Sequence, residues 1–152
     1  MLIRHAKEDD AKQISDLLID SAREFFADDF TESGMALFIA DCTVATLLER
    51  LRHGDRYYVA VIDDVIAGMC AIRRGNHLYS LFTDKAYHRR GIARRLWERA
   101  LVDIRESGYQ EVTVKASNYA AEAYERLGFV RTGTREEKKG IVSNPMIFRM
   151  PS

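Results

Sequence analysis

The segment from Tyr87 to Trp97 places four arginines around Gly91, at the point where a helical apolar periodicity begins. The first backbone N–H groups of a helix and the positive end of its dipole bind anions such as phosphate. Gly91 permits a close backbone approach, and charge-assisted hydrogen bonds are available from Arg89, Arg90, Arg94 and Arg95. Spacing alone leaves a solvated helix face, paired with residues such as Glu98, as an equal alternative.

Composition limits the other uses of this basic segment. The chain has 152 residues with 23 basic and 23 acidic side chains, so it lacks the overall positive field of proteins that bind nucleic acid. No window approaches the roughly 18 apolar residues of a membrane span. Cys42 and Cys70 lack metal-ligand spacing. We therefore expect buried free thiols, no metal, no nucleic-acid or membrane partner, and a cytoplasmic location.

The order of apolar patterns predicts one α/β domain over residues 1–152, with a mixed central β-sheet of about seven strands flanked by about four helices. Expected strands are Leu2–Ala6, Tyr57–Ile62 and Val65–Ile72 as a hairpin, His77–Thr83, Glu111–Ala116, and a closing hairpin of Phe129–Arg135 and Ile141–Met150 in which Pro145 restricts pairing. Expected helices run from Asp9 or Asp10 to Phe26, over Met35–Leu51 with a break near Asp41, from Gly91 to Ile104, and from Ser117 or Asn118 to Leu127.

Two motifs resemble those of one known family. The segment His88–Ala93 resembles the pyrophosphate-binding loop of the GCN5-related N-acetyltransferase (GNAT) superfamily, whose pattern is Gln/Arg-x-x-Gly-x-Gly/Ala between a strand and a long helix. The segment Asn118–Phe129 is similar to the family segment in which an Asn opens a helix and Tyr-x-x-x-Gly-Phe closes it. The expected order of elements resembles that fold as well. His88 stands where Gln or Arg is usual, which changes side-chain contacts but leaves the backbone donors.

This resemblance implies acetyl-CoA as the co-substrate, bound where the strand ending at Thr83 splays from the strand Glu111–Ala116. Its pantetheine arm would pair, like an added strand, with the backbone of Leu81, Phe82 and Thr83. Its pyrophosphate would lie on His88, Arg89, Arg90, Gly91, Ile92 and Ala93. Asn118 would reach the pantetheine amide region. The opening segment would then hold the diphosphate, with the arginines around it.

Tyr124 is the candidate proton donor. It matches the family tyrosine placed near the sulfur, and a phenol with a pKa of about 10 can donate to a thiolate whose conjugate acid has a pKa of about 8.5. The alternative is a purely packing role on the apolar stripe with Ala120 and Leu127. A backbone N–H in the run from Leu81 to Thr83 would hold the oxyanion.

His77 is the candidate base. It corresponds to the place where some relatives carry a base-providing Glu, and regular strand geometry gives it a face shared with Tyr79, Leu81 and Thr83. A turn residue without chemistry is an equally good interpretation of His77. Many relatives use a water chain and no single base.

The expected function is transfer of the acetyl group to a primary amine of a small molecule, by direct attack in a ternary complex. A protein or peptide amine as acceptor, or a CoA-binding sensor without catalysis, are the alternatives, and a homodimer is compatible with each. In this family, acceptor specificity is determined by the segments that correspond to residues 26–56 and 136–144. Acidic residues that suit a cationic amine, or only cap a helix, are Asp28, Asp29 and Glu32. Aromatic residues that suit an apolar wall, or the core, are Phe25, Phe26, Phe30, Tyr57 and Tyr58.

Overall fold

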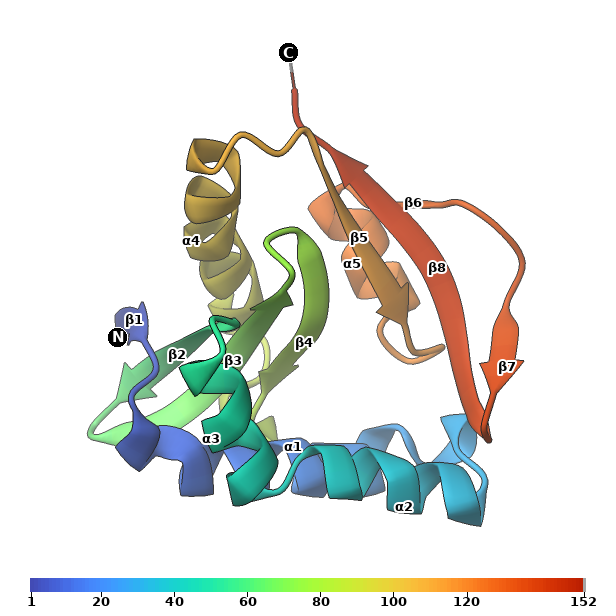
Figure 1. Ribbon diagram of the computed structural model, residues 1–152, viewed down its shortest axis with the longest axis horizontal. Coiled ribbons are helices and arrows are strands. Elements are labelled where there is room, and N and C mark those ends of the chain that lie inside the picture. Colours follow the sequence, from blue (N-terminus) through green and yellow to red (C-terminus); the bar gives the residue numbers. More distant parts are fainter. Residues whose placement is uncertain (152) are drawn as a thin grey trace.

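The computed structural model describes residues 1–151 and contains one mixed sheet of eight strands. The strand order is β1-β2-β3-β4-β5-β8-β6, and β7 pairs with β8 (Figure 1). Only the β4–β5 pair is parallel. The strands are β1 Leu2–His5, β2 Arg56–Ile62, β3 Val65–Arg73, β4 His77–Thr83, β5 Glu111–Ala116, β6 Val130–Arg131, β7 Glu136–Lys138 and β8 Ile141–Arg149.

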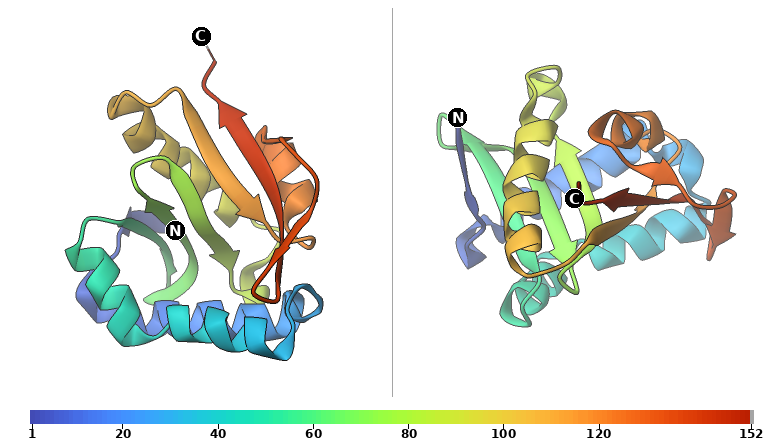
Figure 2. Two further views of the ribbon diagram at one scale, coloured as in Figure 1. Left: turned by 45° about the vertical axis from the view of Figure 1, so that its right-hand side comes forward. Right: turned by 90° about the horizontal axis from the view of Figure 1, so that it is seen from above.

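Helices cover both faces of the sheet, which confirms the predicted α/β class. Residues of α4 and α5 share one core with the sheet, and residues of α1 and α3 share the other. Seen from above, strands lie between α4 and α5 on one side and α2 and α3 on the other (Figure 2). None of the helices in residues 1–151 has the length and apolar character that crossing a membrane requires. The helices are α1 Ala11–Phe25, α2 Glu32–Asp41, α3 Val44–Arg52, α4 Ile92–Glu106 and α5 Ala121–Leu127.

The unbroken apolar run of β2 supplies both cores. Tyr58 and Ala60 are buried on the α4 face, and Tyr57 and Val59 are buried on the α1 and α3 face. Successive residues of a strand point to opposite faces, so an apolar run without alternation fills two layers. Tyr57 and Tyr58 are therefore core residues and not part of an acceptor wall.

Strands β4 and β5 diverge after a short parallel pairing. Only His77 and Leu78 pair with β5, opposite Thr113 and Val114. Beyond these pairs the two strands separate towards the end of the sheet along which α1 and α2 run (Figure 1). The β4 edge over residues 79–83 therefore has no partner strand on this side, which confirms the predicted splay.

A β-bulge interrupts β4 at Tyr79. Leu78 and Ser80 pair with consecutive residues of β3, so Tyr79 is the extra residue. Leu78 and Leu81 consequently both pack in the core on the α4 face, although residues three apart in a regular strand point to opposite faces. The prediction that His77 shares a face with Leu81 is wrong for this reason.

The closing hairpin differs from the prediction in its first strand. In place of one strand over 129–135, the chain forms β6 and, farther along, β7, both paired with β8. The interruption faces Pro145, whose carbonyl accepts the Thr132 N–H at 3.0 Å. Proline has no N–H for the reciprocal bond, so the ladder cannot continue there. Pro145 thus restricts pairing as expected.

The N-termini of two helices differ from their predicted capping. Asp10 occupies the N-cap position of α1, but its carboxylate binds the Arg4 guanidinium and the Lys7 N–H instead of the helix. The N-cap residue of α5 is Ala120, so the predicted cap at Ser117 or Asn118 is wrong; the Ser117 hydroxyl instead accepts the Ala120 N–H at 3.0 Å in the turn before the helix. The break predicted near Asp41 is confirmed, because α2 ends at that residue.

Gly34 of α2 lies against the β7–β8 turn, and we expect Gly34→Ala to be destabilising. A Cβ on Gly34 would lie 2.1 Å from the carbonyl oxygen of Gly140. Alanine normally stabilises a helix by about 1 kcal/mol over glycine, but overpacking costs about 1–3 kcal/mol and no rotamer change relieves a clash with backbone. The expected net loss of unfolding free energy is up to about 2 kcal/mol, measured by chemical denaturation.

Gly133→Ala is the matched control for this prediction. A Cβ on Gly133 meets no atom closer than Pro145 at 3.7 Å, so its stability should stay within about 0.5 kcal/mol of the parent. If Gly34→Ala proved as stable as Gly133→Ala, α2 would not be in close contact with the β7–β8 turn.

Candidate active site

The loop between β4 and α4 forms a cradle for an anion. Within residues 1–151, none of the backbone N–H groups from Arg89 to Arg94 donates to an acceptor, and the Arg95 N–H is the first bonded into the helix. Arg89 and Gly91 have positive φ values of 66° and 73°, as in the backbone nests that bind anions. A Cβ built on Gly91 meets no atom within 4 Å, so this side of the loop is open. Free donors and the helix dipole suit a phosphate here.

The arginines around the cradle have no carboxylate partner. Arg90 lies over the Tyr87 ring at 5.3 Å, and Arg94 donates to the Arg126 carbonyl at 3.3 Å. No ion pair joins any of these arginines to Glu98 in the described part of the chain, so the alternative of a paired helix face is not observed. No acidic side chain of residues 1–151 lies within 4.0 Å of the exposed guanidinium groups of Arg89, Arg90, Arg94 and Arg95.

Strand β4 leads into this cradle with an unused polar edge. Leu81, Phe82 and Thr83 pair with β3 on one side only. The Thr83 hydroxyl is buried and has no hydrogen-bond partner among the described residues, while the Thr83 carbonyl oxygen lies 2.9 Å from His88 Nε2. A buried hydroxyl without a partner is costly unless a ligand or water completes it. The edge and this hydroxyl fit an extended ligand that carries amides.

Tyr124 sits in the last turns of α5. Gly128 has a φ of 107° and the Phe129 N–H donates to the Tyr124 carbonyl at 3.0 Å, so the Tyr-x-x-x-Gly-Phe motif is a Schellman helix end. The Tyr124 side chain is 7% exposed, and its hydroxyl forms no hydrogen bond within residues 1–151. Burial raises the pKa of Tyr124, and the nearby Cys70 raises it further, so the hydroxyl keeps its proton at neutral pH.

Both cysteines are free and buried, as predicted. Burial raises the pKa of the Cys42 thiol to about 12 and raises that of Cys70 as well. Protonated thiols are poor nucleophiles, so neither cysteine is suited to covalent catalysis.

Asn118 joins two segments at the open end of the gap. Its backbone N–H donates to Asp29, between α1 and α2, at 2.7 Å. Its side-chain oxygen accepts from Asn144 of β8 at 2.9 Å, and Asn144 also donates to the Ala116 carbonyl at 3.1 Å. The Asn118 Nδ2 group forms no hydrogen bond within residues 1–151, so it remains available to a ligand.

His77 lies at the opposite, closed end of the gap. It pairs with Thr113, and its Nδ1 is 2.8 Å from the Thr113 hydroxyl. Burial lowers the pKa of His77, and the charges of Arg74 and Lys115 lower it further. His77 therefore lies apart from the other predicted site residues. Those around the open part of the gap are Leu81–Thr83, His88–Ala93, Asn118 and Tyr124.

Aromatic side chains from the end of α1 contact these residues. Phe25 stacks on Tyr119 and lies 5.3 Å from the His88 ring. Phe26 packs edge-on against Phe82 and against Tyr119, each at 5.2 Å. The end of α1 thus places apolar side chains beside the predicted co-substrate residues; Phe26 is a buried core residue, whereas Phe25 is partly exposed.

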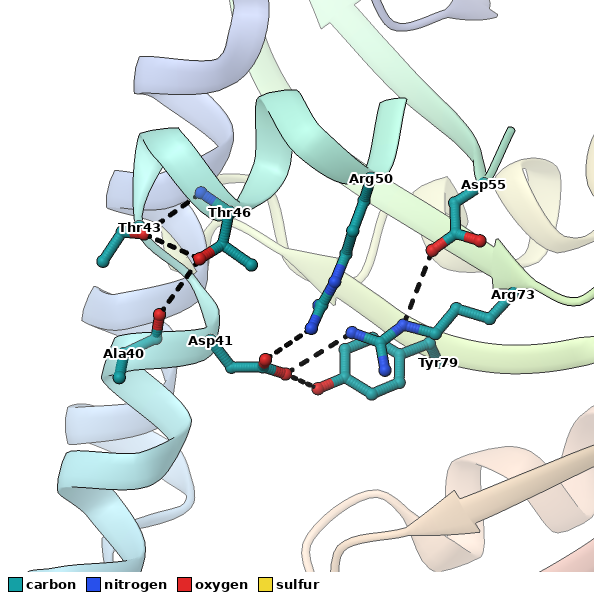
Figure 3. A network of polar contacts seen from close by, with 8 residues as sticks. All are labelled: Ala40, Asp41, Thr43, Thr46, Arg50, Asp55, Arg73 and Tyr79. Atoms are coloured by element: carbon teal, nitrogen blue, oxygen red, sulfur yellow. Dashed lines mark hydrogen bonds and ion pairs between the residues drawn. The ribbon is translucent and has the colours of Figure 1, made fainter. Parts of the chain in front are cut away.

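A polar network on the α2–α3 side escaped the sequence analysis. The Asp41 carboxylate accepts from Tyr79 of the bulge, from Arg50 of α3 and from Arg73 of β3 (Figure 3). Arg73 stacks on the Tyr79 ring at 3.2 Å, and its Nε lies 3.6 Å from Asp55. Burial raises the pKa of Tyr79, which keeps it a donor. No local sequence motif predicts this network, because its five members come from five separate elements or loops.

The splayed sheet and the anion cradle define a domain that binds an extended phosphorylated ligand. The model of the acetyltransferase (GNAT) domain family matches residues 26–150. The chain therefore belongs to the GNAT family, as the two sequence motifs predicted.

Solved structures share the fold. The chain is similar to a GCN5-related N-acetyltransferase from Rhodopseudomonas palustris, with a TM-score of 0.87 and 21% identity over 98% of this chain and 95% of that one. PaiA N-acetyltransferase from Thermoplasma acidophilum, solved with coenzyme A, gives a TM-score of 0.83 and 17% identity over 98% of both chains. N-acetyltransferase 8 of Homo sapiens is 26% identical over 117 residues, or 69% of this chain. The chain spans 50% of the length of that curated relative.

Proposed function

We propose that this protein is an acetyl-CoA-dependent N-acetyltransferase whose acceptor is a primary amine of a small molecule. The observation that carries the proposal is the run of unbonded N–H groups from Arg89 to Arg94, placed directly after a strand with a free edge. Membership of the GNAT family and similarity to an N-acetyltransferase solved with coenzyme A support it.

The residues around the gap fit acetyl-CoA. The cradle His88–Ala93 suits its diphosphate, and the edge Leu81–Thr83 with the unpaired Thr83 hydroxyl suits its amide-bearing arm. Asn118 Nδ2 offers a further donor to the arm. Bound acetyl-CoA supplies an activated acetyl thioester, which the amine attacks directly in a ternary complex. We assign the role of oxyanion donor to a backbone N–H of the Leu81–Thr83 run, which has no partner in β5.

Tyr124 is the proposed proton donor to the leaving sulfur. Its raised pKa keeps the proton on the hydroxyl oxygen, which has no competing acceptor in the described residues. A phenol in that state donates a hydrogen bond or a proton to a thiolate that forms beside it. His77, at the closed end of the gap and bonded to Thr113, receives no role, and we assign deprotonation of the amine to water.

Turnover on small amines is the direct test of this function. With acetyl-CoA and a panel of primary amines, thiol detection should show release of coenzyme A for at least one small acceptor. Coenzyme A binding without turnover on any small amine or peptide would instead favour a sensor module. Turnover on peptide amines alone would indicate that the acceptor is a protein or peptide amine.

Gly91→Glu should abolish acetyl-CoA binding in calorimetry, because it places bulk and negative charge where the diphosphate approaches. Gly108→Glu is the matched control: Gly108 also has a positive φ, 90°, and open space around its Cβ position, but it follows the other end of α4. Both substitutions bear similar backbone strain, so only the anion site distinguishes them. Equal acetyl-CoA affinity in the two variants would refute the cradle assignment.

Tyr124→Phe removes the hydroxyl and keeps the ring that packs on Phe129. We expect normal stability and acetyl-CoA affinity, with kcat lower by about 10²- to 10⁴-fold and little change in the KM of the acceptor. Tyr109→Phe, at an exposed tyrosine after α4, should leave kcat unchanged. A Tyr124→Phe enzyme with kcat within about twofold of the parent would leave protonation of the sulfur to water.

A further inference from the structure

The side chain of His88 is held at one ring nitrogen by the strand that leads into the cradle. Its Nε2 lies 2.9 Å from the carbonyl oxygen of Thr83. A carbonyl oxygen only accepts hydrogen bonds, so Nε2 carries the hydrogen and donates it. His88 is the first residue of the cradle and stands where the family motif usually has Gln or Arg. Neither of those side chains changes its charge near neutral pH, whereas histidine does.

The carbonyl that His88 binds lies at the free edge of β4. Thr83 pairs with Gly68 of β3, and the Asp84 N–H donates to the Ala67 carbonyl at 2.8 Å. In an antiparallel ladder, a bond between the residues that flank a pair means that the pair itself directs its N–H and C=O groups away from the partner strand. The Thr83 carbonyl therefore points to the side that β5 leaves open. The His88 ring thus joins the edge proposed for the arm of acetyl-CoA to the cradle proposed for its diphosphate.

The other ring nitrogen of His88, Nδ1, has no hydrogen-bond partner within residues 1–151. It is bonded to the carbon that attaches the ring to the side chain, so it lies beside the main chain of His88, where the unbonded N–H groups of Arg89–Arg94 begin. Because Nε2 carries the hydrogen, Nδ1 of the neutral ring has a lone pair. Phosphate oxygens are acceptors as well, so the neutral ring offers them no donor at Nδ1. The protonated ring adds an N–H donor and a positive charge at the start of the cradle.

The described residues around His88 supply no anion for a protonated ring. The ring packs on Phe25 at 5.3 Å, and no acidic side chain of residues 1–151 lies within 4.0 Å of it. Glu24 of α1 is paired with Lys85 at 3.0 Å, and Asp84 accepts a backbone N–H at 2.9 Å. Of the titratable side-chain types in these segments, only histidine changes its charge between about pH 5 and 8. The remaining titratable side chains here are Arg23, Tyr87, Arg89, Arg90 and Tyr119.

We infer that His88 takes up a proton from solvent at Nδ1 when the diphosphate of the co-substrate binds, so that the affinity for acetyl-CoA falls as pH rises through the range in which histidine titrates. This inference rests on the proposed N-acetyltransferase function and concerns the regulation of its co-substrate site. The complex holds the proton more firmly than the free protein. The gain in affinity is therefore complete where free His88 is already protonated, and it is lost as pH rises until the complex is deprotonated too.

The test is calorimetric titration with 3′-dephospho-coenzyme A, which keeps the diphosphate and the arm but lacks the 3′-phosphate that itself titrates near about pH 6. The parent should bind this ligand about tenfold more tightly at pH 6 than at pH 8, as for a charged hydrogen bond, and two buffers of different ionisation enthalpy should reveal net proton uptake. His88→Gln keeps an N–H for the Thr83 carbonyl but cannot titrate, and His88→Arg is always charged. Both should show neither effect. His53→Gln, at an exposed histidine between α3 and β2, should behave as the parent.

Three outcomes would overturn the inference. They are binding by the parent without proton uptake, proton uptake that persists in His88→Gln, or an equal loss of uptake in His53→Gln. Should His88→Gln be unstable, His88→Arg takes its place, since it too removes the titration. Because these titrations require no turnover, proton-linked binding without acetyl transfer to any amine would refute the proposed function alone. Acetyl transfer by a protein whose affinity for the ligand is the same at pH 6 and pH 8 would refute this inference alone.

Discussion

The candidate site depends on the early end of the parallel pairing between β4 and β5. Backbone N–H and C=O groups need partners, so a strand that loses its neighbour within a covered sheet requires water or a ligand to complete it. The pairs at His77 and Leu78 keep the sheet continuous, and β8 extends it beyond β5. The remaining edge of β4 is held by β3 alone and runs directly into the cradle before α4. One interruption of a ladder thus aligns an amide-binding edge with a phosphate-binding helix start.

The bulge at Tyr79 decides which side chains share this gap. One extra residue lets Leu81 join Leu78 in the core on the α4 face. It also positions Tyr79 to bind Asp41, so the bulge is fastened to the α2–α3 junction. A bulge leaves no clear mark in sequence, since any residue can be the extra one. Regular period-two counting therefore failed at His77 although the strand boundaries were right.

The sequence predicted what local chemistry determines. Helix stripes, the hairpin before β3, the glycine after α5 and the effect of Pro145 each follow from residue type and spacing, and the family motifs added the cradle and the position of Tyr124. Contacts between distant segments were not predictable in this way. Asp29 meets Asn118, 89 positions away, and Asp41 meets Tyr79, 38 positions away. The sequence identified Asp28, Asp29 and Glu32 as a group, and only burial separates Asp29 from the others.

Two carboxylates flank the gap, and their hydrogen-bond partners show that each fastens a different pair of elements. Asp41 accepts from two guanidinium groups and a phenol, so its charge is compensated within the protein and it serves to hold α2 and α3 against the bulge. Asp29 accepts the backbone N–H of Asn118 and so ties the loop after α1 to the loop before α5. Both lie in the segment between α1 and α3, which comes from neither strand of the gap. Asp41 therefore fixes the end of α2 to β4, and Asp29 fixes the loop before α2 to the segment that follows β5, so one stretch of chain is tied to both sides of the gap.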